Sequence, residues 1–273
     1  MKKFCIWGYL SIFVLISYFV KAEESSDYKF INMNLMYGVG MENPYLSKND
    51  QYFELEFGGK SGFLSLYGYF DVLNVFQNKS SDMKGLDNFF TEIKPKIALD
   101  ELFGKKFFVG NSDIALQNIF ITTELKAGDN ALMYYYIGLG TDVVTKIGNF
   151  SISLNSIYKA EDYNSLAQNK FDGYMLDTSW FLKLKTFKNG SYLTYQGYLT
   201  YSFGASKIEK ESGRSSDELQ NFNGIYYHFN KIAVGYGLKI YYNMGFIKDS
   251  YVVGGLKQET TGIGHFFDLT YKF

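Results

Sequence analysis

The segment Gly264-His265-Phe266-Phe267-Asp268-Leu269-Thr270-Tyr271-Lys272-Phe273 ends the chain and decides its fold class. Counted back from Phe273, every second residue is apolar or aromatic until His265, and the residues between them are mostly polar. This period of two is typical of a β-strand with one apolar and one polar face, and such a strand crosses a bilayer when it is tilted. A soluble protein can also bury such a strand. The N-terminal residues are therefore needed to distinguish a membrane protein from a soluble one.

The first 22 residues have the organisation of an export signal. Met1-Lys2-Lys3 is basic, Phe4 to Val20 is almost wholly apolar, and Val20-Lys21-Ala22 ends in a small residue before an acidic stretch. This order predicts a cleaved signal peptide over residues 1–22 and an exported domain over residues 23–273. The alternative is an uncleaved helical anchor, although the apolar stretch is near the lower limit of about 17 residues for a spanning helix.

The composition excludes several classes of protein. The single cysteine, Cys5, lies in the signal, so the exported chain has no thiol for a disulfide, for catalysis or for a metal. Aromatic residues make up 19% of the chain and only two residues are Pro, which favours long strands. Removing residues 1–22 takes away three lysines and lowers the Lys+Arg count from 27 to 24, against 28 Asp+Glu. No basic face predicts a nucleic-acid partner.

The same alternation recurs along the chain and predicts twelve antiparallel strands. They cover about 31–37, 52–57, 64–71, 89–97, 114–124, 131–142, 150–155, 172–184, 192–203, 222–229, 232–243 and 264–273. An even number of strands brings both ends of a barrel to the periplasmic side. Short inner turns and long outer loops alternate along the chain. Two connections break this rule: the outer connection 127–130 is short and the inner connection 99–112 is long, so the strand assignment between them is open. Pro95 has no N–H to donate to a neighbouring strand. It indicates either a bulge in the fourth strand or that residues 89–97 are not a strand.

The polar face of these strands separates a membrane barrel from a soluble one. It carries Glu54, Glu56, Asp71, Glu92, Lys94, Lys96 and Lys239. Burying so many charges in a dry core would be costly unless each were paired, whereas a water-filled lumen avoids that cost. We therefore predict an all-β fold, a transmembrane antiparallel β-barrel of about 12 strands in the bacterial outer membrane, whose polar face lines a channel.

Aromatic side chains alternate with the charges on that face. They are Tyr52, Phe63, Tyr67, Tyr69, Phe90, Tyr134, Tyr136, Tyr174, Tyr192 and Tyr198. A ring can stack on a planar base with about 1–3 kcal/mol per base, and carboxylates accept hydrogen bonds from hydroxyls. The pattern suits a solute that is flat at one end and a polyol at the other. The alternative is that these rings only fill a narrow lumen or form interfacial girdles.

No catalytic or metal site is predicted. The two histidines, His228 and His265, have no Ser-containing motif beside them that would give a nucleophile with its base. Gly138-Leu139-Gly140 lacks the lysine of a phosphate-binding loop, and no metal-ligand spacing is present. We expect a protein that is not an enzyme and that has no cofactor.

Several segments, in order, resemble the Tsx family of nucleoside-specific outer-membrane channels. They are residues 49–56, 66–71, 90–97, 137–142, 171–174 and 271–273. The resemblance implies a monomeric twelve-stranded barrel with a narrow pore, in which aromatic side chains hold the base of a nucleoside or deoxynucleoside and ionisable side chains hold the sugar. The candidate solute-binding residues are Tyr52, Glu54, Glu56, Tyr67, Tyr69, Asp71, Glu92, Lys94, Asp142, Asp172 and Tyr174. Residues 37–43 and 204–260 depart from the family pattern.

Other interpretations remain open at this stage. Glu54 and Glu56 have the alternative of an ion pair with Lys94 or Lys96, and Asp172-Gly173 that of a turn. The chain as a whole has the alternatives of a pore for another small solute, a structural or adhesive barrel, and an outer-membrane hydrolase. The expected partners are nucleosides or similar small polar solutes, outer-membrane lipid, and the barrel-assembly machinery through Phe273. Nothing in the sequence specifies a phage or bacteriocin receptor.

Overall fold

A computed structural model describes residues 27–44, 48–76, 88–105, 114–129, 132–145, 148–162, 165–206, 213–253 and 256–273. The expected signal peptide, residues 1–22, lies outside the described residues and stays a prediction. None of the helices in the described part of the chain has the length and hydrophobicity of a membrane span, a criterion that does not apply to strands.

Twelve long strands form the wall. They are β1 (Tyr28–Val39), β2 (Asn49–Ser61), β3 (Leu64–Val72), β4 (Phe89–Ala98), β5 (Ile114–Gly128), β6 (Leu132–Thr145), β7 (Gly148–Asp162), β8 (Lys170–Thr186), β9 (Tyr192–Phe203), β10 (Glu218–Phe229), β11 (Ile232–Tyr242) and β14 (Gly262–Lys272). Helix α2 (Leu99–Phe103), the 3₁₀ helix η1 (Met244–Phe246) and the short strands β12 (Val252–Val253) and β13 (Leu256–Lys257) lie in connections.

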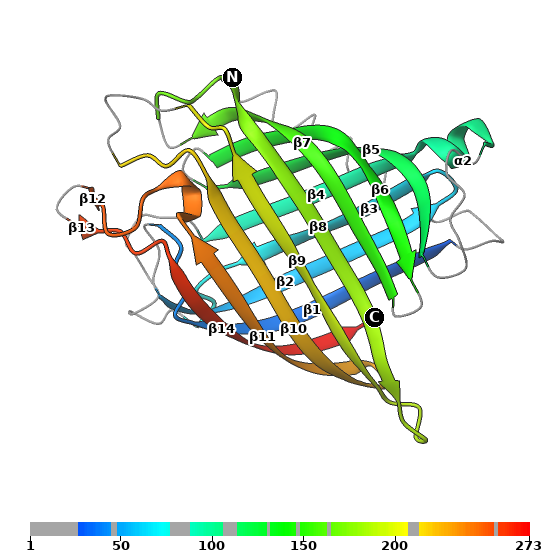
Figure 1. The fold of residues 1–273 in the computed structure, drawn as a ribbon. Coiled ribbons are helices and arrows are strands. Elements are labelled where there is room, and N and C mark those ends of the chain that lie inside the picture. The colour runs from blue at the N-terminus through cyan, green and yellow to red at the C-terminus, as the bar shows by residue number, and fades with distance from the viewer. Residues whose placement is uncertain are drawn as a thin grey trace.

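The strands close into one antiparallel barrel (Figure 1). Each strand from β1 to β10 pairs with the next, and β14 pairs with both β11 and β1. In the closing pair, Leu35 lies opposite Leu269 and Tyr37 opposite Phe267, so apolar side chains of the two strands meet on the same face. The predicted closed barrel of twelve strands is confirmed.

The two faces of the wall differ as period-two alternation predicts. On β14, Phe267 and Leu269 are each 49% exposed, whereas Phe266 and Thr270, which point inward, are buried. Exposed aromatic and aliphatic side chains recur on the outer face of the other strands. Such a surface fits lipid, because the bilayer core solvates apolar side chains and the closed barrel leaves no strand edge unpaired.

Two of the places where the sequence pattern is irregular, Pro95 and the long inner connection, fit the barrel. Pro95 keeps its place in β4 and pairs with Leu66 of β3, while on the other side the ladder skips from Ile93–Leu125 to Lys96–Thr122. Pro95 has no N–H to donate, and its position in β4 coincides with this gap in the β4–β5 ladder. Part of the long inner connection is helix α2, so both flanking strands were predicted correctly.

Candidate functional site

The lumen is defined by contacts between strands that are not neighbours. Lys94 Nζ on β4 lies 3.3 Å from Asp177 Oδ2 on β8, and Lys96 Nζ donates to Ser151 Oγ on β7 at 2.7 Å. Since β4 hydrogen-bonds only to β3 and β5, these side chains must reach across the interior. The even-numbered residues of β4, including Glu92, therefore point into the barrel.

A network of ion pairs crosses the middle of this lumen. Lys94 Nζ lies 2.8 Å from Glu92, 3.3 Å from Glu124 and 3.3 Å from Asp177. Lys126 Nζ lies 3.1 Å from Glu124 and 3.5 Å from Glu92. Two ammonium groups are thus shared by three carboxylates, which stabilises charges that would be costly to leave unpaired. The network joins β4, β5 and β8 through the lumen.

A second wall carries carboxylates without lysine partners. Glu54 accepts a hydrogen bond from Asn34 Nδ2 at 2.6 Å, and Glu56 accepts one from Asn32 Nδ2 at 2.8 Å. Asp71 lies directly opposite Glu54 in the β2–β3 ladder. Within the described residues, none of these three carboxylates is ion-paired with a lysine or arginine, so the alternative of a pair with Lys94 or Lys96 is wrong. We call Glu54, Glu56, Asp71 and Asp268 of β14 the acidic wall.

Aromatic side chains lie along the border between the network and the acidic wall. The phenol of Tyr67 donates to Glu56 Oε1 at 3.2 Å, and that of Tyr69 donates to Glu92 Oε2 at 3.2 Å. The ring of Tyr69 lies 6.4 Å from that of Tyr67 and 6.0 Å from that of Phe90. Tyr67 is 37% exposed although it faces inward, so its ring is open to the lumen. These three rings form a row, and a carboxylate lies at the phenol end of each of the two tyrosines.

Tyr52 has a different environment. Its side chain is buried in a cluster with Met36, Met41, Tyr241 and Phe266. The ring therefore fills the wall of the lumen, as the alternative interpretation of the tyrosines expects, and presents little free face to a solute.

The structure contradicts the inward placement of Tyr174. Gly173 has a φ of 96°, and the β7–β8 register shifts beside it, from the pair Ser156–Tyr174 to the pair Tyr158–Phe171. The bulge interrupts the alternation, so Tyr174 points outward, where it is 51% exposed and packs on Phe203 at 5.9 Å. The Asp-Gly pair was the signal for this irregularity.

Asp172 faces inward but is closed to solutes. Its side chain is 0% exposed and is ion-paired with Lys159 and Arg214. Lys159 Nζ also lies 3.5 Å from Asp162 and 4.0 Å from the centre of the Phe246 ring in η1. We call Lys159, Asp162, Asp172 and Arg214 the rim cluster, since it ties the β9–β10 and β11–β14 connections to the ends of β7 and β8. The carboxylate of Asp172 is therefore taken up by contacts within the protein, and its solute-binding role stays a prediction.

The last candidate, Asp142, lies near the periplasmic end of β6. It is paired with Ser151 of β7 in the ladder, and the hydroxyl of Ser151 accepts the hydrogen bond from Lys96. Glu124, Lys126 and Asp177 were not predicted from the sequence, although Glu124 and Lys126 follow the same period of two that identified Glu92 and Lys94.

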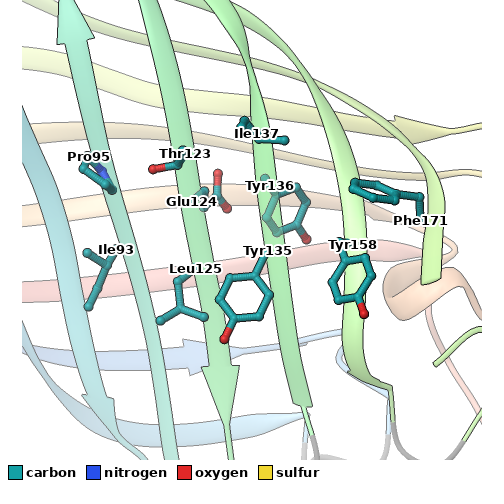
Figure 2. A pocket seen from close by; sticks show the side chains of 10 residues that line it. All are labelled: Ile93, Pro95, Thr123, Glu124, Leu125, Tyr135, Tyr136, Ile137, Tyr158 and Phe171. Carbon is teal, nitrogen blue, oxygen red and sulfur yellow. The ribbon is translucent and has the colours of Figure 1, made fainter. Parts of the chain in front are cut away.

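A hollow of about 470 Å³ lies against the wall at β4 to β8 (Figure 2). Its lining consists of Ile93, Pro95, Thr123, Glu124, Leu125, Tyr135, Tyr136, Ile137, Tyr158 and Phe171. Most of these side chains are apolar and lie on the outer face, beside the gap in the ladder at Pro95. The hollow therefore belongs to the lipid-facing surface and not to the path of a solute.

The described ranges contain no group of three or more His, Cys, Asp or Glu side chains that could hold a metal ion.

The closed barrel, its apolar outer surface and its charged interior define an outer-membrane channel-forming protein.

The chain belongs to the family of nucleoside-specific channel-forming proteins, Tsx, whose model matches residues 25–273. It is 36% identical to outer membrane protein OmpK of Vibrio parahaemolyticus, over 92% of this chain and 89% of that protein. It is 26% identical to the nucleoside-specific channel-forming protein Tsx of Klebsiella pneumoniae, over 83% of this chain and 82% of that protein. A solved NanC porin covers 89% of this chain and 100% of its own, with a TM-score of 0.51 and 10% identity, which shows the fold alone. The family resemblance is confirmed, and the protein is an outer-membrane protein.

Proposed function

We propose that this channel passes nucleosides and deoxynucleosides by passive diffusion. The observation that carries the proposal is the row of Tyr67, Tyr69 and Phe90 beside carboxylates that bind the two phenols. An open ring stacks on a base, and the carboxylates of the acidic wall accept hydrogen bonds from ribose hydroxyls. Relatives named as nucleoside-specific channels support this choice of solute. Weak contacts at successive rings let a solute enter without trapping it.

Ion current through single channels in planar bilayers tests the proposal, because a nucleoside in the pore blocks the current. We expect adenosine to block the wild-type channel and Tyr67→Leu to weaken the block about fivefold or more, the loss of one stacked ring. Tyr135→Leu is the matched control, since Tyr135 is 45% exposed on the outer face. If adenosine neither blocks the current nor crosses the membrane, nucleoside selectivity is refuted while the barrel stands.

A pore for another small polar solute is the second candidate, because the central network offers hydrogen-bonding groups to any polyol. Ribose that crosses proteoliposomes as fast as adenosine would favour this candidate. Near-zero conductance of the folded protein would favour a structural or adhesive barrel.

The remaining expectations are part of the same proposal. We propose that the exported chain begins at Glu23 and works as a monomer without catalytic activity. Phe273 is 67% exposed at the end of the closing strand, which leaves it accessible to the barrel-assembly machinery. Mass spectrometry of the purified protein, alone and after cross-linking, tests the cleavage site and the oligomeric state.

A further inference from the structure

One group of lumen side chains takes no part in the function proposed above. It lies at the periplasmic end of the barrel and consists of Lys183 on β8, Tyr192 on β9, His228 on β10 and Lys272 on β14. We call these four residues the basic cluster. Tyr192 is the first residue of its strand and Lys272 the last residue of its own, so the cluster lies at the inner mouth.

The ring of Tyr192 holds the cluster together. Lys183 Nζ lies 4.7 Å from the centre of this ring, and Lys272 Nζ lies 5.4 Å from it. His228 stacks on the same ring at 4.4 Å with an angle of 12° between the planes. Both ammonium groups are therefore held against the same rigid side chain.

A small side chain on β11 explains how residues from four other strands can meet in the basic cluster. Between β10 and β14, the inward residue of β11 is Ala233, which pairs with His228 on one side and with Thr270 on the other. Because its side chain is only a methyl group, Lys272 can reach across β11 to Tyr192. The imidazole of His228 is oriented by Thr194, whose hydroxyl lies 2.9 Å from Nε2.

The positive charge of the basic cluster is not neutralised by the protein. Over the part of the chain that the structure describes, neither Lys183 nor Lys272 is ion-paired with a carboxylate, in contrast to Lys94 and Lys126 in the central network. His228 Nδ1 is buried and has no hydrogen-bond partner. Two like charges and an unused imidazole nitrogen around one ring suit a partner with negatively charged oxygens.

We propose that the basic cluster is a binding site for a phosphate group, as inorganic phosphate or as part of a phosphorylated solute. Lys183 and Lys272 supply the charge, Tyr192 fixes both ammonium groups, and His228 supports the ring. This site does not rest on nucleoside selectivity, because it lies at the inner mouth and uses none of the residues of the aromatic row.

Phosphorus-31 NMR of the refolded full-length exported protein in phosphate-free detergent solution tests the site. The probes are inorganic phosphate and glucose 1-phosphate, which separate a free ion from a phosphorylated solute. We expect the signal of one or both to broaden with wild type, and Lys183→Gln or Lys272→Gln to weaken binding about tenfold or more, since each removes a charge-assisted contact.

Lys231→Gln is the matched control, because Lys231 is at the same end of the barrel with its ammonium over Tyr271 on the outer face. It should bind the probes as wild type does. Heat-modifiable migration on gels checks that every variant is folded. The proposal is overturned if wild type binds neither probe, or if Lys231→Gln weakens binding as much as Lys183→Gln and Lys272→Gln do.

Discussion

Replacing Lys94 by Met removes the cation that joins β4, β5 and β8 through the lumen. Lys126 would still contact Glu92 and Glu124. Asp177, by contrast, has no other cation within ion-pair distance in the described ranges, so its carboxylate would be left facing Glu124 without compensation. We therefore expect the barrel to be destabilised mainly through Asp177.

The size of the effect follows from the burial of the pair. Removing one partner of a buried ion pair costs about 3–5 kcal/mol. The side chains of Lys94 and Asp177 are 14% and 15% exposed, so water in the lumen reaches both. We expect Lys94→Met to lower the free energy of unfolding by about 2–3 kcal/mol, below the range for a dry core. The double variant Lys94→Met, Asp177→Asn should recover about half of this loss, because the amide carries no charge.

Urea unfolding in lipid vesicles, followed by tryptophan fluorescence, measures the change. Trp180 is the only tryptophan after residue 22 and lies on β8, the strand of Asp177. Lys185→Met is the control, since Lys185 is exposed and is ion-paired with no carboxylate of the described residues. A free energy within about 0.5 kcal/mol of wild type for Lys94→Met, or no recovery in the double variant, would refute the reasoning.

Three further outcomes test other parts of the structure. Gly173→Ala should destabilise the barrel by about 1–3 kcal/mol in the same unfolding assay. The φ of Gly173 is 96°, and an added Cβ would lie 2.7 Å from the carbonyl oxygen of Phe203. An unchanged midpoint of urea unfolding would contradict the bulge. Lys159→Met removes one of the two cations that the buried carboxylates of the rim cluster share and leaves them with Arg214, so the outer connections should become sensitive to added protease, and equal cleavage of both proteins would contradict the anchoring role. The pKa of Asp249 is lowered, first by the backbone N–H of Thr260, so its contribution to loop order is present above the ordinary carboxyl pKa and is lost as pH falls through the lowered pKa. The protection factor of the Thr260 amide in hydrogen exchange should therefore fall at acid pH in wild type and be lowered already at neutral pH in Asp249→Asn.

The strands were predictable because their signal is local. Alternation with a period of two depends only on the two faces of one strand, and it identified all twelve strands of the barrel. The inward direction of Glu54, Glu92 and Lys94 follows from the same pattern, since a lipid-facing charge is costly.

The contacts across the lumen were not predictable in this way. Lys94 and Asp177 are separated by 83 residues, and their meeting depends on which strands face each other once the barrel closes. The bulge at Gly173 turns Tyr174 to the other face, and period counting cannot place such an insertion within a residue. The burial of Asp172 depends on Arg214, which comes from a distant connection.

The unequal walls of the lumen have a consequence for any molecule that passes. In the described part of the chain the carboxylates of the acidic wall have no ion pair with a lysine or arginine, and in the central network three carboxylates face only two ammonium groups. The network therefore carries a net negative charge, as the acidic wall opposite does. The electrostatic potential in the middle of the lumen favours a cation over an anion of the same size, so the channel discriminates by charge as well as by size.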